Sequence, residues 1–159
     1  MTARRPPGFS FIELLATLAI MATLLLVAVP SARLATQRHR EAELRTALTS
    51  LRDAIDRYKK AVDQGKIPIK AGDSGYPPDL AVLAEGVEDA SRPDRRKIYF
   101  LRRLPADPLY GGGARDPADT WGLRSYASPP GEPAAGDDVY DVYSTSGGIG
   151  LNGVAYKDW

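Results

Sequence analysis

The chain contains no cysteine and a single histidine, His39, among its 159 residues. The absence of cysteine excludes a disulfide framework, a thiol nucleophile and a cysteine-based zinc site. One histidine cannot form a histidine pair around a metal, and there is no cysteine to make a catalytic dyad with it. Because His39 lies in a stretch rich in arginine and glutamate, we expect its side chain to be solvated.

An excess of charge of one sign is also missing. The chain has 21 Lys and Arg against 20 Asp and Glu, for a formal net charge of +1. A balance this even gives no electrostatic reason to expect a nucleic-acid partner. The length leaves room for one domain beyond the apolar N-terminal segment.

Charge is almost absent from the 21 residues between Phe9 and Val29, where Glu13 is the only ionisable side chain. In helical form such a segment extends about 31 Å, which matches the hydrocarbon core of a bilayer. A carboxylate there costs several kcal/mol unless it finds a partner, so an acid in this position is a candidate functional residue.

A short basic leader, residues 1–8, precedes the apolar segment and ends at Gly8. In a secretory signal peptide the cleavage site follows the apolar region. Here the only plausible processing site comes before that region, so the mature chain would keep its apolar helix, residues 9–30. Cleavage would create an α-amino group on Phe9, which stands four residues before Glu13 and so on the same helical face.

Two interpretations of Glu13 follow. The carboxylate either satisfies the amino group and dipole of its own helix, or it pairs with the amino group of a neighbouring subunit and sets the register of assembly. Pro30 ends the apolar run. Because proline removes a backbone donor, we expect a kink or local melting upstream of Pro30 when subunits pack; the alternative is a helix that ends there.

Residues 31–64 predict the amphipathic second half of the same long helix. Its apolar stripe repeats at spacings of three and four, as expected for a face packed on a domain: Leu44, Leu48, Leu51, Ile55, Tyr58 and Val62. Gly65 is the expected stop.

The remaining residues, 65–159, predict a small head. We expect a short helix over 79–84 with Asp79 as N-cap, a solvated charged loop over 85–97, and a strand or short helix beginning at Ile98. Strands are expected over 120–127, 139–144 and 154–159, paired antiparallel against the helical stripe. The predicted fold class is α+β.

The segment Gly8-Phe9-Ser10-Phe11-Ile12-Glu13 resembles the cleavage and methylation motif of type IV prepilins and type II secretion pseudopilins. Further resemblance to the major pseudopilin comes from the head, in Leu104-Pro105-Ala106-Asp107-Pro108, Trp121-Gly122 with Tyr126, the strand from Asp138 to Ser144, and Trp159. The resemblance implies a pilin-like ladle, cleavage after Gly8 by a prepilin peptidase, N-methylation of Phe9, and assembly through Glu13 and Pro30.

The implied function is that of a non-enzymatic subunit of a periplasmic pseudopilus that helps to export folded proteins by type II secretion. The implied partners are copies of itself, other pseudopilins, the inner-membrane assembly platform and the outer-membrane secretin machinery. The implied location is the bacterial inner membrane, crossed once, with the head in the periplasm. Because basic residues flank the span on both sides, charge alone does not fix its orientation, and the leader motif decides it.

Two alternatives stay open. One is a type IV pilin or a minor pseudopilin; the other is a membrane-tethered periplasmic enzyme, with Asp107 and Asp116 as an acid and base pair. Loop capping explains those aspartates equally well.

The resemblance also implies a calcium ion in the loop after the strand 139–144. Calcium takes six to eight oxygen ligands, whereas residues 145–157 contain no Asp or Glu and leave Asn152 and Asp158 as the only clear side-chain candidates. We therefore expect no cofactor, and expect the glycine-rich turn, with Leu151 and Tyr156 packing inward, to replace the ion.

Overall fold

The computed structural model describes residues 8–114 and 116–159, together with the backbone but not the side chain of Val27. Of the predicted leader, only Gly8 lies inside the described residues. The chain divides into two compact units, Met1–His39 and Arg40–Trp159, which we describe separately. The expected α+β class with a long N-terminal helix and small antiparallel sheets is confirmed.

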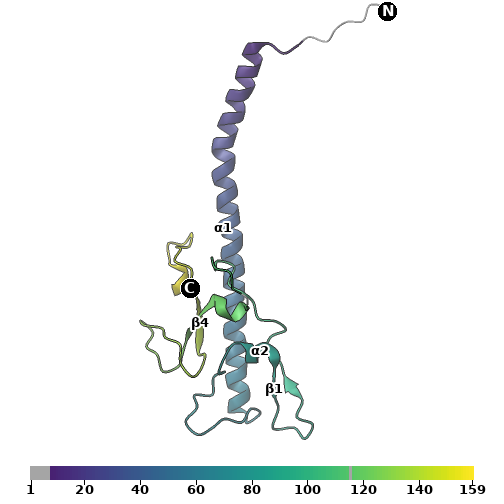
Figure 1. Cartoon of the computed structure of the whole chain (residues 1–159), viewed down its shortest axis with the longest axis vertical. Helices are drawn as coiled ribbons and strands as arrows, with labels where there is room; N and C mark the ends of the chain where they lie inside the picture. Colours follow the sequence, from purple (N-terminus) through teal and green to yellow (C-terminus); the bar gives the residue numbers. More distant parts are fainter. Residues whose placement is uncertain (1–7, 115) are drawn as a thin grey trace, which may run out of the picture. The chain divides into compact units, whose positions relative to one another are not determined.

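One helix, α1, extends from Phe11 to Asp63 and contains Pro30 (Figure 1). The alternative of a helix that ends at Pro30 is therefore wrong. A proline in a helix interior cannot donate to the carbonyl four residues earlier, here that of Leu26. The helix tolerates this loss because the residues on both sides of Pro30 keep helical hydrogen bonds.

The C-terminal end of α1 is closed by a Schellman motif. Gly65 has a φ of 70°, its N–H donates to the carbonyl of Val62 at 2.8 Å, and the N–H of Lys66 donates to that of Ala61 at 3.0 Å. Glycine is favoured here because other residues rarely adopt a positive φ. The predicted helix stop at Gly65 is confirmed.

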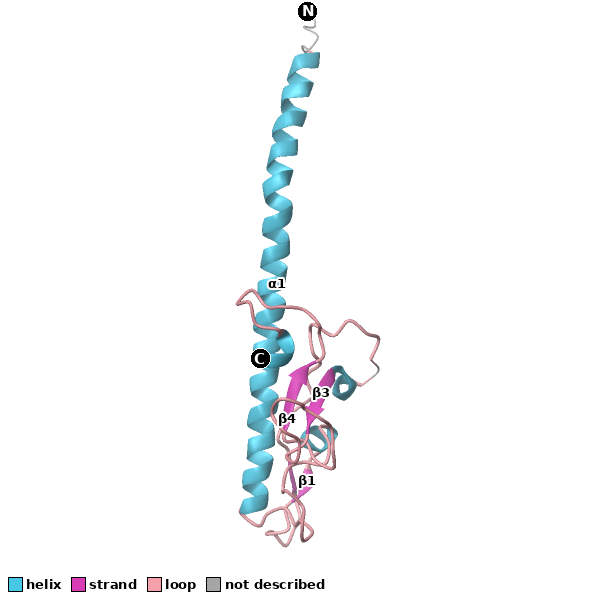
Figure 2. Ribbon diagram, turned by 90° about the vertical axis from the view of Figure 1, so that its left-hand side faces the viewer, coloured by secondary structure: helices cyan, strands magenta, loops and turns pink. Residues whose placement is uncertain are grey.

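The apolar stripe of α1 forms one wall of the core of the second unit. All six predicted stripe residues are buried, and Leu44 and Leu51 are fully so. The opposite wall comes from the head and includes Leu83, Phe100, Trp121, Val139 and Val142. Figure 2 shows β3 and β4 beside the C-terminal half of α1.

Two small antiparallel sheets complete this unit. Strand β3, Trp121–Arg124, pairs with β4, Asp141–Ser144, so that Trp121 faces Ser144 and Arg124 faces Asp141. Strand β1, Val87–Glu88, pairs with β2, Lys97–Ile98. The segment expected as a solvated loop, 85–97, thus contains most of a hairpin, and Asp89 within it is buried.

The remaining elements are one short α-helix and two 3₁₀ turns among the described residues. Helix α2 covers Ala81–Glu85, two residues later than its predicted start. Asp79 still accepts a hydrogen bond from the N–H of Val82 at 2.9 Å, so it satisfies a donor of the first turn. The turns are η1, Pro117–Thr120, and η2, Tyr156–Asp158.

The prediction of a third strand over 154–159 is wrong. Only Ala155 makes a bridge, to Ile149, before the chain turns into η2. This turn packs Tyr156 edge-on against Trp159, with ring centroids 5.1 Å apart, a favourable geometry for an aromatic pair. Tyr156 is buried as predicted, but Leu151 is 46% exposed, so its predicted inward packing is also wrong.

Candidate functional site

The predicted processing residues, Gly8 and Phe9, lie just before α1 and Glu13 lies in its first turn, whereas Pro30 lies in the helix interior. The carbonyl of Ser10 accepts the first helical hydrogen bond, from the N–H of Leu14 at 3.1 Å, which places Glu13 in the first turn. An acid there is favoured by the helix dipole. Phe9 lies two residues before the helix begins, so the expected i, i+4 relation with Glu13 requires the helix to extend by two residues after cleavage.

The apolar half of α1 is fully open in the single chain. An 18-residue window has a mean hydropathy of 2.5 and is 0% buried, so by length and composition α1 contains one candidate membrane span. Large apolar side chains are exposed along it, with Phe11 at 77% and Leu24 at 64%. Glu13 is exposed as well.

The polar side chains within this half are satisfied by the helix itself. The hydroxyl of Thr17 donates to the carbonyl of Leu14 at 2.9 Å, and that of Thr23 donates to Ile20 at 2.8 Å. Hydroxyls paired in this way can enter a lipid or protein interior without an unsatisfied donor. Glu13 differs, because no hydrogen bond or ion pair links it to another residue within 8–114 or 116–159.

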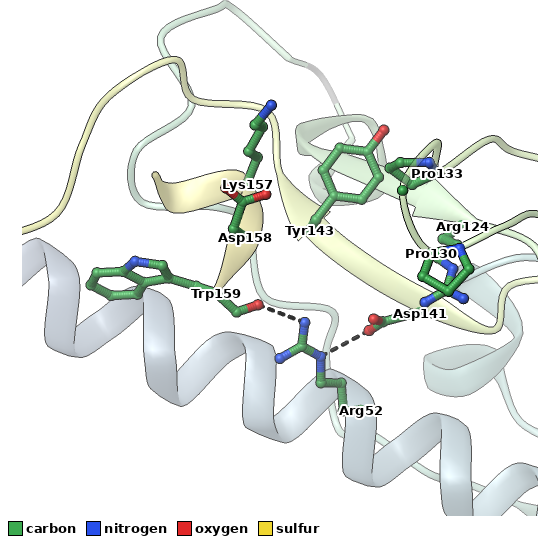
Figure 3. Close-up of a pocket in the computed structure, with 10 residues that line it drawn as sticks. Arg52, Arg124, Pro130, Pro133, Asp141, Tyr143, Lys157, Asp158 and Trp159 are labelled. Atoms are coloured by element: carbon green, nitrogen blue, oxygen red, sulfur yellow. Dashed lines mark hydrogen bonds and ion pairs between the residues drawn. The ribbon is translucent and has the colours of Figure 1, made fainter. Parts of the chain in front are cut away.

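In the second unit, Arg52 of α1 binds three groups from the C-terminal part of the chain (Figure 3). Its Nε donates to Asp141 Oδ1 at 2.8 Å, and its Nη2 donates to the main-chain oxygens of Val142 at 3.2 Å and Trp159 at 2.8 Å. The sequence reasoning missed this role, because Arg52 stands on the polar side of the helix in a row of other charges.

Glu41 is the second residue that the sequence reasoning missed. It is only 7% exposed, and its Oε1 accepts from the N–H of Leu151 and from the hydroxyl of Tyr156, both at 2.9 Å. Its position three residues before Leu44, in line with the apolar stripe, was a usable signal. Glu41 and Arg52 together fix the glycine-rich turn and the C-terminal residues on α1.

A partly buried carboxylate, Asp138, also ties loops of the head together. Asp138 accepts hydrogen bonds from the hydroxyls of Ser74 and Ser125 and from the N–H of Tyr126. Burial alone would raise the pKa of Asp138, but these hydrogen bonds outweigh it and hold the pKa below its ordinary value. The ionised form is therefore the one that this site stabilises.

The two aspartates considered as a catalytic pair both have structural partners. Asp107 is buried; it accepts from the hydroxyl of Ser144 at 2.6 Å and from the N–H of Leu109 at 2.8 Å. Asp116 accepts from the N–H of Ala118 at 2.9 Å, as the cap of η1. Both carboxylates thus serve as loop caps, as the alternative interpretation expected.

The predicted calcium candidates, Asn152 and Asp158, do line one shallow pocket. The fit to calcium is poor, because Arg45 and Arg52 line the same pocket and guanidinium groups repel a cation. In addition, the Oδ1 of Asn152 already accepts from the N–H of Val154 at 3.1 Å. Within the described residues no group of three or more His, Cys, Asp or Glu side chains is arranged to hold a metal.

Comparison with known proteins identifies the N-terminal segment. Residues 4–29 match the family described as the prokaryotic N-terminal methylation motif. No curated protein matches the chain, and no solved structure does. The motif, together with the exposed apolar helix behind it, supports a type IV pilin-like protein that is anchored in a membrane, processed by a prepilin peptidase and able to polymerise like a pilus.

Proposed function

We propose that this pilin-like chain is a structural subunit of a periplasmic pseudopilus that drives the export of folded proteins by type II secretion. Its role is mechanical rather than enzymatic. Before assembly it crosses the inner membrane once, with the unit 40–159 in the periplasm. A cytoplasmic ATPase acting through the inner-membrane platform supplies the energy, and the polymer pushes cargo towards the outer-membrane secretin.

The observation that carries the proposal is the order of features at the N-terminus. The candidate cleavage site, Gly8–Phe9, precedes an apolar helix that the mature chain keeps, and one acid stands in the first turn of that helix. In a signal peptide that is removed, such an acid would have no role in the mature protein. In a subunit that leaves the membrane to pack beside identical helices, the acid can pair with a group of the neighbouring helix.

The physics of that transfer explains why Glu13 matters. Lipid is as apolar as a neighbouring helix, so burial of hydrocarbon contributes little to the step from membrane to filament. Van der Waals packing and the pairing of Glu13 with the amino group of Phe9 in an adjacent copy then select the register. A mispaired register leaves both charges without a partner in an apolar setting, which costs several kcal/mol.

The resemblance of the head to major pseudopilins supports the finer assignment to type II secretion over a type IV pilus. It rests on the segment around Trp121, the strand from Asp138 to Ser144, and Trp159. A minor pseudopilin would share the same N-terminal chemistry but occur at the filament tip only.

The substitution Glu13→Ala tests the role of the acid. We expect it to leave membrane insertion intact or improved, because it removes a charge from the apolar segment. Filament formation and secretion of a folded cargo should fall at least tenfold, because the register is no longer selected. The measurements are cell fractionation, filament counts after overexpression, and cargo in the medium against cargo in the periplasm.

The matched control is Glu132→Ala, which removes an exposed acid from a loop of the head and should leave all three readouts unchanged. Normal filaments and normal secretion by Glu13→Ala cells would disprove the pairing. Loss of surface filaments with secretion unaffected would instead favour the type IV pilin alternative.

A further inference from the structure

A pocket of about 370 Å³ opens beside Arg52 in the second unit. Figure 3 shows its walls: Arg52 from α1, Arg124 from β3, Asp141 and Tyr143 from β4, the turn with Pro130 and Pro133, and the C-terminal Lys157 and Asp158. Segments distant in sequence thus present polar and apolar groups to one small space.

Arg124 is the unusual member of this pocket. Its Nε is buried and has no hydrogen-bond partner among the described residues, and its guanidinium lies over the ring of Tyr140 at 5.1 Å. The carboxylate opposite it in the sheet, Asp141, is bound to Arg52 instead. A buried donor without an acceptor is unfavourable, so an acceptor bound at the Arg124 guanidinium would relieve that cost.

Two further donors line the same pocket. Neither the ammonium of Lys157 nor the hydroxyl of Tyr143 makes a hydrogen bond or ion pair within the part of the chain that the structure describes. Arg52 is already held by Asp141 and by the main-chain oxygen of Trp159. Arg124 and Lys157, by contrast, have no ion-pair partner within the described residues.

We propose that this pocket binds a carboxylate group. A guanidinium presents a planar pair of N–H donors that matches the two oxygens of a carboxylate, and Lys157 and Tyr143 line the same pocket with two further donors. A phosphate dianion would bring a second negative charge close to Asp141 and Asp158, which line the same pocket. Pro130 and Pro133 offer an apolar wall to the carbon stem of the ligand.

The carboxylate can come from a small molecule or from an acidic side chain of a second copy of the chain. The chemistry at Arg124 is the same for both sources. The proposal does not depend on the pseudopilus assignment, because it uses only groups within residues 40–159 and can be measured on a single chain.

The test is an NMR titration of the full-length, ¹⁵N-labelled chain in detergent micelles at constant ionic strength. Sodium butyrate is the probe, and sodium phosphate at the same concentration is compared with it. We expect butyrate to shift the Arg124 Nε–Hε signal and the amides of β3 and β4, saturating on the order of 1–10 mM as befits one charged contact. Phosphate should shift them at least threefold less.

The variant Arg124→Gln should abolish the response, whereas Arg102→Gln, which removes an exposed arginine outside the pocket, should retain it. A dilution series without butyrate separates the two sources: signals that move with protein concentration indicate the carboxylate of a second copy, and constant signals indicate a small molecule.

Three results would overturn the proposal. The first is the absence of a saturable shift with butyrate together with no dependence on protein concentration. The second is a response that persists in Arg124→Gln while that variant keeps the wild-type amide spectrum elsewhere. The third is a phosphate response equal to that of butyrate, which would rule out selectivity for a carboxylate.

Discussion

At the residue scale, Asp138 shows how a carboxylate stabilises a head that has no cysteine. Its oxygens join the segment before α2, the loop after β3 and the segment that leads into β4. Those three stretches have little regular structure of their own, so Asp138 adds side-chain hydrogen bonds to the few backbone and ring contacts that hold them together. Asp107 has a similar role, because it accepts hydrogen bonds from Ser144 of β4 and from the N–H of Leu109 in the loop before η1.

The lowered pKa of Asp138 makes its contribution depend on pH. A group whose pKa is lower in the folded state stabilises the fold above its unfolded pKa, about 3.9 for aspartate, and loses that contribution as the pH falls through the folded value. We expect Asp138→Asn to lower the free energy of unfolding by about 1–2 kcal/mol at pH 7, with the difference shrinking below about pH 4.

Urea unfolding of the full chain in micelles, followed by circular dichroism from pH 3 to pH 7, measures this effect. Asp137→Asn, at an exposed neighbouring position, is the control and should follow the wild type. Parallel pH profiles for wild type and Asp138→Asn would show that the hydrogen bonds do not favour the ionised form.

Gly122 illustrates a different constraint at the same scale. A Cβ added to it would lie 2.3 Å from the ring of Tyr143, its partner in β4. We expect Gly122→Ala to destabilise the fold by about 1–3 kcal/mol, because the ring must leave its place over the glycine. Gly147→Ala, where a Cβ meets nothing within 4 Å, should change stability by no more than about 0.5 kcal/mol. Equal denaturation midpoints for the two variants would contradict this prediction.

At the scale of elements, α1 is one helix with two different chemical halves. The first half is apolar all round and exposed; the second is amphipathic and buries its stripe. Pro30 stands at the end of the first half and removes one hydrogen bond, to Leu26. That defect marks the place where the helix is easiest to open.

We expect Pro30→Ala to stabilise this part of α1 by about 3 kcal/mol, the difference in helix propensity. Hydrogen exchange of the amides near residue 30 should slow markedly in micelles, and filament formation should weaken if assembly requires local melting. Val29→Ala, which keeps the proline, should exchange like the wild type. Exchange that does not change in Pro30→Ala would show that the proline leaves the helix intact.

At the scale of the whole molecule, processing decides which chain enters the filament. Gly8 lies outside α1, and a Cβ added to it meets no atom within 4 Å. We therefore expect Gly8→Leu to fold and insert normally while it blocks cleavage, so that intact-mass spectrometry finds the precursor with residues 1–8 attached. A product of mature mass would contradict the cleavage site, and a wild-type chain that begins beyond residue 30 would contradict the retained helix.

The features that depend only on the spacing of nearby residues were predicted correctly from the sequence. The apolar run with its single acid, the stripe from Leu44 to Val62 and the stop at Gly65 all follow from spacing along one helix, and the structure agrees with them. The sequence predicted the C-terminal residues poorly. The strand expected over 154–159 is a turn, and Leu151 faces outward.

The sequence by itself determined that this chain carries a basic leader followed by an acid-bearing apolar helix, because helix periodicity and the order of leader and span are properties of neighbouring residues. Only the tertiary structure decided that Arg52 and Glu41 hold the C-terminal segment, and that Arg124 is left without an acceptor. Those outcomes depend on groups about a hundred positions apart, and such contacts are selected by competition among all possible partners rather than by any local pattern.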